Sequence, residues 1–97
     1  MKAIFHREAH EEMIQSALFY EGKSEALGLD FLTAVEETTR RIEQLPEAGL
    51  IDRDNIRKRL VSGFPFTILY EIQTDRIFIA AVMHQHRRPY YWKTRVE

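Results

Sequence analysis

Two apolar runs dominate the hydrophobic pattern of the second half of the chain. Residues 66–72 alternate, and the positions that share one face are Phe66, Ile68, Tyr70 and Ile72. Residues 77–83 are apolar throughout and are mostly β-branched, aromatic or alanine. Their length and residue types predict two strands, and the polar residues 73–76 fit a hairpin turn between them. A fully apolar strand is expected at a central position, buried on both faces.

The first half of the chain carries apolar residues at helical spacing. This spacing predicts one helix from Glu8 to about Glu21, with Glu12 on its outer face and Gly22 as its C-terminal stop. A second helix is predicted from Ser24, as its N-cap, to Leu45. Its inner face would be formed by Leu27, Phe31, Val35, Thr38, Ile42 and Leu45. The short connection makes the two helices an antiparallel hairpin.

The remaining segments complete the expected fold. Residues 3–6 read as a short strand, 46–55 as an exposed loop, 56–61 as a third strand, and 90–95 as a final helical turn. The order is therefore β-αα-βββ. This order predicts an α+β fold in which a helical hairpin packs on a mostly antiparallel four-stranded sheet. We expect a single domain that spans residues 1–97.

Composition narrows the class of protein. The sequence has no cysteine, which excludes disulfides and thiolate metal sites and suits a reducing compartment. No run approaches the roughly 18 apolar residues that span a bilayer. The N-terminus becomes acidic by Glu8, unlike a secretory signal. We therefore expect a soluble, cytoplasmic protein that contacts no membrane.

The net charge of −1 conceals an asymmetry. Residues 1–55 hold six basic and twelve acidic side chains, whereas residues 56–97 hold eight basic and three acidic ones. Solvated helix faces account for most of the acidic half. The basic half concentrates its charge at strand ends beside aromatic residues, a pattern that suits a polyanion or an acidic protein partner.

Arg57 and Arg59 are the first candidate site residues. At i, i+2 on a strand they share one face, and their guanidinium groups suit a phosphate or a carboxylate. The alternative is a solvated face, or pairing with Asp52 and Asp54 in the preceding loop.

The segment after the last strand supplies the other candidates. Arginines beside aromatic rings can stack on bases and bind phosphates, or form the centre of a protein interface. Alternatively the aromatic rings, Trp92 above all, fold back over the end of the sheet. His84 and His86 share a strand face and could act in acid–base chemistry or bond the strand end. No acidic residue or third histidine stands near them, so we expect no metal. No phosphate-loop, nucleophile-elbow or dinucleotide motif occurs, and we expect no cofactor.

The sequence resembles the RelE/ParE superfamily of toxins from bacterial type II toxin–antitoxin modules, also called plasmid stabilisation proteins. The resemblance covers nearly the whole chain. In the first half it rests on Phe5, Ala9, Phe19-Tyr20, Leu27-Gly28, Phe31 and Pro46. In the second half it is stronger and rests on Arg59-Leu60, Phe64-Pro65-Phe66, Ile68-Leu69-Tyr70, Ile77 to Val82, and the string His84-x-x-Arg87-x-Pro89-x-x-Trp92. That last string is typical of the ParE-like side. The superfamily's fold has the order β-αα-βββ.

The resemblance implies one of two mechanisms. RelE-like members cut messenger RNA on the ribosome, whereas ParE-like members poison DNA gyrase. Of the positions expected in a ribonuclease, three match in type and are Arg57, Arg59 and Arg87. A further arginine is expected where Thr67 stands, and the expected tyrosine falls near Lys93, with Tyr90 and Tyr91 close by. Thr67 supplies no charge to a phosphorane, which counts against ribonuclease activity.

The sequence is therefore interpreted as a ParE-like toxin that inhibits growth by poisoning DNA gyrase, without enzymatic activity of its own. A cognate antitoxin would neutralise it and could assemble with it as a hetero-oligomer, its tail contacting Arg87, Arg88 and Trp92 on one side and the helical hairpin on the other. The alternatives are a ribosome-dependent endoribonuclease acting on messenger RNA, and an inactive partner-binding module. The candidate residues for binding a target or partner are Arg57, Arg59, His84, His86, Arg87, Arg88, Tyr90, Tyr91, Trp92 and Arg95. Those for catalysis, in a ribonuclease, are Arg57, Arg59, Arg87, Tyr90 and Tyr91.

Overall fold

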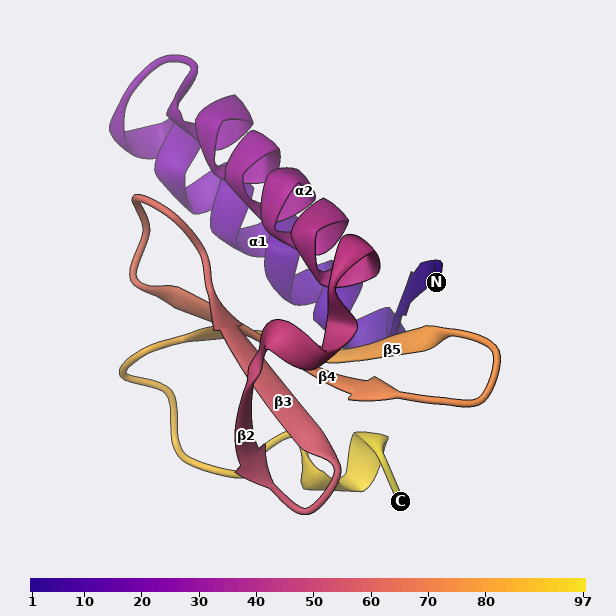
Figure 1. The fold of residues 1–97 in the computed structure, drawn as a ribbon. Coiled ribbons are helices and arrows are strands. Elements are labelled where there is room, and N and C mark those ends of the chain that lie inside the picture. The colour runs from indigo at the N-terminus through magenta and orange to yellow at the C-terminus, as the bar shows by residue number, and fades with distance from the viewer.

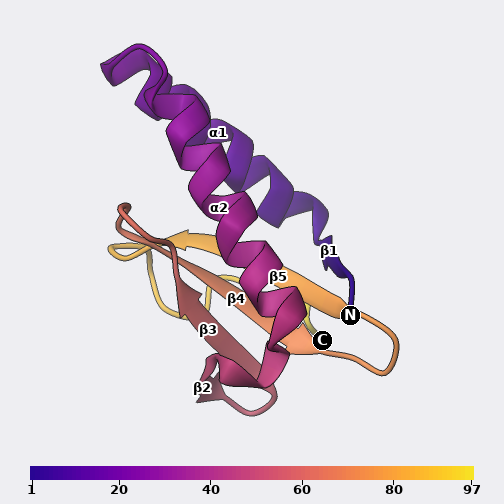
Figure 2. The ribbon, with the colours of Figure 1, turned by 45° about the horizontal axis from the view of Figure 1, so that its top comes forward.

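The computed structural model describes residues 1–97 and arranges them in two layers (Figure 1). The elements in chain order are β1 (Ala3–Phe5), α1 (Arg7–Lys23), α2 (Leu27–Gln44), the 3-10 helix η1 (Pro46–Ala48), β2 (Leu50–Arg53), β3 (Ile56–Leu60), β4 (Phe66–Ile72), β5 (Ile77–His84) and the 3-10 helix η2 (Lys93–Arg95). The helices α1 and α2 run side by side across one face of a twisted sheet (Figures 1 and 2). The C-terminal segment crosses the other face. The α+β prediction is confirmed.

The sheet has five strands in the order β1-β5-β4-β3-β2, one more than the sequence predicted. β1 runs parallel to β5, and the other neighbours are antiparallel. The additional strand, β2, lies within the predicted loop 46–55. It forms because Leu50 pairs with Lys58 and Ile51 with Arg57. It is an edge strand whose leucine and isoleucine remain 70% and 65% exposed, so burial imposes no alternation on its sequence.

The turn between the helices differs from the prediction. α1 continues through Gly22 to Lys23, and α2 begins only at Leu27. Ser24 does not cap α2, because Ala26 takes the N-cap position in a left-handed conformation with no side-chain bond of its own. Instead the carboxylate of Glu21 accepts the backbone N–H groups of Ala26 and Gly28, each at 3.0 Å. A residue of α1 thus satisfies the free N–H groups at the start of α2.

Gly28 permits the close approach of the two helices. A Cβ atom at this position would lie 2.5 Å from the carbonyl oxygen of Ala17 in α1. The glycine that lowers helix propensity inside α2 is therefore required by packing.

The main core lies between the helices and the sheet. The even-numbered positions of β4 share one face, as predicted, and the structure shows that this face lies toward the helices, where Phe66, Ile68 and Tyr70 are buried. The predicted inner face of α2 packs on them, except that Leu45 is 65% exposed because the helix ends at Gln44. β5 lies between β1 and β4, and its residues Ile77 to Val82 are buried apart from partly exposed Phe78, which confirms its interior position.

A smaller core covers the opposite face of the sheet. It consists of Ile56, Leu69, Ala81 and Trp92. Trp92 is 3% exposed, so its ring folds back over the sheet. The C-terminal segment therefore completes the fold. No helix is both long and apolar enough to span a membrane.

Candidate functional site: two basic regions on either side of β4

The two arginines of β3 share the helix-facing side of the sheet, as predicted from strand alternation. Arg57 pairs across the strands with Tyr70, and Arg59 pairs with Ile68. The Nη1 atom of Arg57 donates to the backbone carbonyls of Glu47 at 3.0 Å and Gly49 at 2.9 Å. Arg57 therefore holds the connection between α2 and β2 in place.

The predicted alternative for this strand, pairing with the acidic loop, applies to a different residue. Lys58, on the other face of the strand, lies 3.5 Å from the carboxylate of Asp52. Neither Arg57 nor Arg59 forms an ion pair with Asp52 or Asp54. The side chain of Arg59 has no hydrogen bond or ion pair, and its Nη1 atom is buried without a partner.

Tyr70 lies beside this pair of arginines and contacts the same connection. Its O–H donates to the carbonyl of Pro46, and a Cβ atom on Gly49 would lie 2.1 Å from the same phenol oxygen. A glycine is thus required at position 49, because the Tyr70 phenol approaches the backbone there too closely for a side chain. Burial raises the pKa of Tyr70, against smaller lowering effects of the Gly49 backbone and the charges of Arg57 and Arg59.

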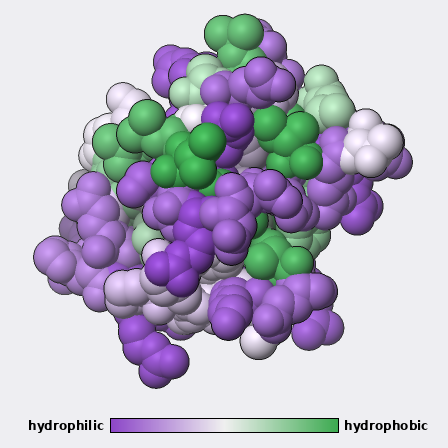
Figure 3. Space-filling view, turned by 60° about the horizontal axis from the view of Figure 1, so that its bottom comes forward, coloured by the Kyte–Doolittle hydropathy of each residue, from purple (hydrophilic) through white to green (hydrophobic).

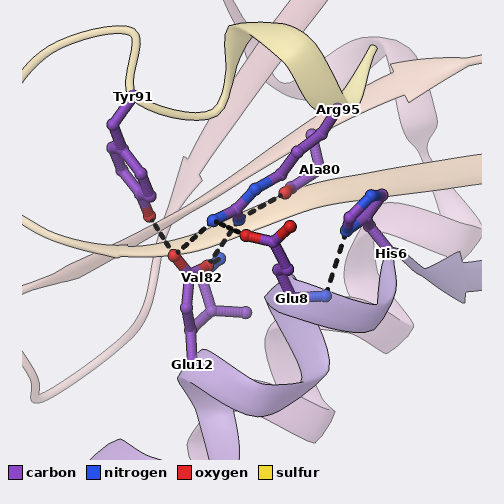
Figure 4. Close-up of polar contacts among 7 residues, drawn as sticks. All are labelled: His6, Glu8, Glu12, Ala80, Val82, Tyr91 and Arg95. Atoms are coloured by element: carbon purple, nitrogen blue, oxygen red, sulfur yellow. Dashed lines mark hydrogen bonds and ion pairs between the residues drawn. The ribbon is translucent and has the colours of Figure 1, made fainter.

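On the other side of β4, along β5, the C-terminal segment is bonded to α1 through Glu12 (Figure 4). Nη1 and Nη2 of Arg95 donate to the two carboxylate oxygens of Glu12, at 3.0 and 3.1 Å. The phenol of Tyr91 donates to the same carboxylate at 2.6 Å. Glu12 also accepts the backbone N–H of Val82 at 3.1 Å, and Arg95 donates to the carbonyl of Ala80 at 3.0 Å.

These bonds satisfy backbone groups of Ala80 and Val82 on the free edge of β5. β1 ends at Phe5, opposite Ile79, so the residues after Ile79 have no neighbouring strand on that side. The pairing of β4 with β5 also skips Ala80, which marks a β-bulge. The ion pair of Glu12 and Arg95 takes the place of the missing strand.

Burial and charge perturb the groups of this network. Burial raises the pKa of Tyr91, and its bond to Glu12 raises it further. Burial lowers the pKa of Arg95, but hydrogen bonding and attraction to Glu12 outweigh that effect, so its pKa is raised overall. Tyr91 therefore remains a neutral donor and Arg95 a cation at physiological pH.

The sequence-based interpretations of three residues change with this geometry. Arg95 was a candidate for binding a target, but its side chain is 7% exposed and paired internally. Trp92 was another candidate, and its ring lies in the smaller core, in agreement with the alternative considered for it. Glu12 was expected on the outer face of its helix, yet it is the centre of this network. No signal in the sequence near Glu12 indicates this role, because its partners lie 70 or more positions away.

The exposed part of the C-terminal region is the loop 85–89. Arg87 and Arg88 are exposed, and the guanidinium of Arg87 lies 4.0 Å from the centre of the Tyr91 ring. At the loop's start, Nδ1 of His84 accepts the N–H of His86 at 3.0 Å, and the His84 ring packs on Phe66. Tyr90, with a positive φ of 60°, lies under the guanidinium of Arg53 at 3.5 Å.

A groove of about 600 Å³ runs between α1 and the free edge of β5. One wall is acidic and includes Glu8, Glu11 and Glu12, whereas the other is basic and includes His84, Arg87 and Arg95. Phe19, which is 61% exposed, borders the groove. Viewed from the bottom of Figure 1, the surface is mostly hydrophilic, with separate hydrophobic patches (Figure 3). No group of three histidine, aspartate or glutamate side chains is placed to hold a metal ion.

Comparison with known proteins identifies the family. A solved structure described as the chromosomal ParDE TA system from P. aeruginosa superposes with a TM-score of 0.69 at 17% sequence identity, covering 87% of this chain and 95% of that one. This likeness shows that the fold is shared. No match was found among curated protein sequences. The family model described as the ParE toxin of the type II toxin–antitoxin system parDE matches residues 3–89. The chain therefore belongs to the ParE family of toxins from type II toxin–antitoxin systems.

Proposed function

We propose that this toxin inhibits growth by poisoning DNA gyrase, and that a cognate antitoxin neutralises it by binding along the α1 groove. The ribosome-dependent ribonuclease is the competing mechanism. It requires several cations converging on one phosphate. The position of the basic residues is the observation that supports the choice of gyrase.

The basic residues line different hollows. Arg57 borders a small hollow with Ile51 and Ile72, and its guanidinium already donates to two carbonyls. Arg59 borders a hollow at the sheet's outer corner. Arg87 borders the groove beside α1 and a small cavity next to Trp92. This distribution does not favour a shared phosphate site.

Thr67 supports the same choice. It stands where the ribonuclease pattern expects an arginine, and it is 6% exposed. It pairs with Leu60 on the face of the sheet opposite Arg59. Its hydroxyl supplies no charge, and a longer cationic side chain at this site would be buried. By analogy with removal of one oxyanion-hole donor, the loss of one preorganised cation costs on the order of 10²–10³ in rate.

The loop 85–89 is the surface we assign to gyrase. Arg87 and Arg88 are exposed, and the partly exposed Tyr91 lies directly beneath Arg87. Arginine and tyrosine are frequent at the energetic centre of protein interfaces. Trp92 and Arg95 contribute indirectly, because their buried contacts hold the segment that follows this loop against the sheet.

The groove beside α1 suits the antitoxin. It combines the basic wall formed by His84 and Arg87 with the ring of Phe19 on α1, which is 61% exposed. An extended or helical amphipathic tail with acidic side chains on the side that faces His84 and Arg87 would complement these features. Folding of such a tail on the toxin should bury on the order of 1,000–3,000 Å² and give a strongly negative heat-capacity change.

Induction of the toxin in growing cells tests the mechanism. We expect growth arrest with a DNA-damage response while protein synthesis continues. The double variant Arg87→Ala/Arg88→Ala should relieve the arrest, whereas Arg40→Ala/Arg41→Ala, two exposed residues of α2, should not. Co-expression of the product of the adjacent open reading frame should restore growth. Immediate arrest of translation, with no DNA-damage response, would favour the ribonuclease.

A further inference from the structure

Arg59 is a cation without a partner in the free protein. Its guanidinium makes no hydrogen bond or ion pair, although one of its nitrogens is buried. A buried donor that lacks an acceptor is costly and rare in folded proteins. Its neighbours differ, because Arg57 donates to two carbonyls and Lys58 pairs with Asp52. A single guanidinium is thus left without an acceptor in this strand.

The backbone next to Arg59 also lacks a partner. The N–H of Val61 bonds the carbonyl of Phe66 in β4, and alternation along the strand directs the backbone of Leu60 the other way. β2 pairs with β3 only as far as Leu50, opposite Lys58, because the residues before β2 form the 3-10 helix η1. Leu60 therefore presents a free N–H and C=O at the edge of the sheet.

A hollow of about 520 Å³ lies at this corner. It is lined by Ala48, Gly49, Leu50, Lys58, Arg59 and Leu60, which we call the β3 corner. Leu50 and Leu60 are 70% and 67% exposed. The corner thus combines a free cation, a free strand edge and two exposed leucines within one depression.

We propose that the β3 corner binds an extended segment of the antitoxin, with a carboxylate on Arg59 and apolar side chains on Leu50 and Leu60. The backbone of Leu60 then pairs with the segment as an added strand. This inference rests on the proposed function, since it requires an antitoxin, and it assigns a second contact away from the α1 groove. A carboxylate fits better than a nucleic acid, because a nucleic acid needs several free cations along its phosphates and this corner offers one.

The test uses the full toxin and the purified product of the adjacent open reading frame. Isothermal titration should show that Arg59→Met weakens binding on the order of 30-fold or more, as for removal of one partner of a desolvated charge pair. The matched control Arg41→Met, at an exposed position of α2, should bind like the wild type. Hydrogen exchange should show protection of the Leu60 amide only in the complex.

The free toxin provides an independent readout. Because Arg59→Met removes an unpartnered buried donor and keeps the apolar stem, its melting temperature should equal or exceed that of the wild type. A clear fall in melting temperature would mean that Arg59 has an internal partner, and it would overturn the inference.

The outcomes separate this inference from the proposed function. If the wild type does not bind the neighbouring gene product, the proposed function fails and the inference fails with it. If the wild type binds tightly and Arg59→Met binds equally well, with the Leu60 amide unprotected, only the inference fails. Binding of a short RNA oligonucleotide that Arg59→Met abolishes, with antitoxin affinity unchanged, would assign the corner to nucleic acid instead.

Discussion

Glu12 and Arg95 are 83 positions apart in the sequence and form a doubly hydrogen-bonded ion pair that closes the free edge of β5. Each partner also bonds the strand, Glu12 through the N–H of Val82 and Arg95 through the carbonyl of Ala80. The pair therefore joins the first helix, an inner strand and the C-terminal segment. This arrangement makes the C-terminal region part of the fold as well as the support of the exposed loop 85–89.

Removing one partner of this pair should be strongly destabilising. Glu12→Ala leaves the buried guanidinium of Arg95 with only the half-exposed carboxylate of Glu8, at 3.3 Å, and the carbonyl of Ala80. We expect a loss of up to about 3–5 kcal/mol in the free energy of unfolding. Urea denaturation followed by circular dichroism measures this loss. The exposed pair of Glu36 and Arg40 is the control, because Glu36→Ala should cost about 0.5 kcal/mol or less. Equal losses for the two variants would contradict the structural role of Glu12.

Truncation after Pro89 should abolish stable folding. It removes Trp92 from the smaller core and Arg95 from its pair with Glu12, and loss of the tryptophan side chain alone costs about 3–5 kcal/mol. Circular dichroism and thermal melting test this. The double variant Arg87→Ala/Arg88→Ala should melt within a few degrees of the wild type, because both residues are exposed. A truncated protein with a native melting transition would show that the segment is dispensable for the fold.

The two glycines of the helical hairpin should respond in opposite directions to alanine. A Cβ atom at Gly28 would meet the Ala17 carbonyl at 2.5 Å, so Gly28→Ala should lower the melting temperature despite the gain in helix propensity. Gly22 has no atom within 4 Å of such a Cβ, so Gly22→Ala should stabilise the protein by about 0.5–1 kcal/mol. Thermal melting of both variants decides the matter, and a stabilised Gly28→Ala would contradict the close helix contact.

Stability should fall at alkaline pH, in part through Tyr91. Its pKa is raised in the folded state above the ordinary value of 10.0, so the folded protein holds the phenol proton more tightly than the unfolded chain. The corresponding stability is fully present below about pH 10 and is lost as the pH rises further. Urea midpoints at pH 9 and pH 11 should differ less for Tyr91→Phe than for the wild type. Tyr20 and Tyr70, whose pKa values burial also raises, contribute to the slope that remains. Equal pH dependence in both proteins would contradict this assignment.

The sequence predicted those parts of the fold that depend on local patterns. The alternation in residues 66–72 identified the limits of β4 and the residues that share one of its faces, and the structure shows that the helices cover this face. β2 was missed because an exposed edge strand has no buried face to impose a pattern. The start of α2 was placed too early because the group that caps it, Glu21, belongs to the preceding helix.

The sequence predicted which residues gather at the candidate site, but it did not predict which of their side chains are exposed. The sequence indicated a cluster of arginines and aromatic residues after β5 as the site. In the structure, some members of this cluster are exposed and others are buried. Arg87 and Arg88 are exposed, whereas Trp92 and Arg95 are buried by contacts with distant residues. The spacing of residues along the sequence does not predict contacts between residues that are far apart in the chain. Likewise, adjacency in β3 did not indicate that Arg57 and Lys58 find acceptors while Arg59 does not.

The most direct test of the central claim is a gyrase supercoiling assay with the purified toxin, run beside primer-extension mapping of transcripts translated in its presence. We predict inhibition of supercoiling with no new transcript ends. Loss of an interface centre in Arg87→Ala/Arg88→Ala should weaken the inhibition by about 30-fold or more, while Arg40→Ala/Arg41→Ala retains it. Unimpaired supercoiling, together with codon-positioned transcript cuts that vanish in Arg59→Ala and Arg87→Ala, would contradict the account.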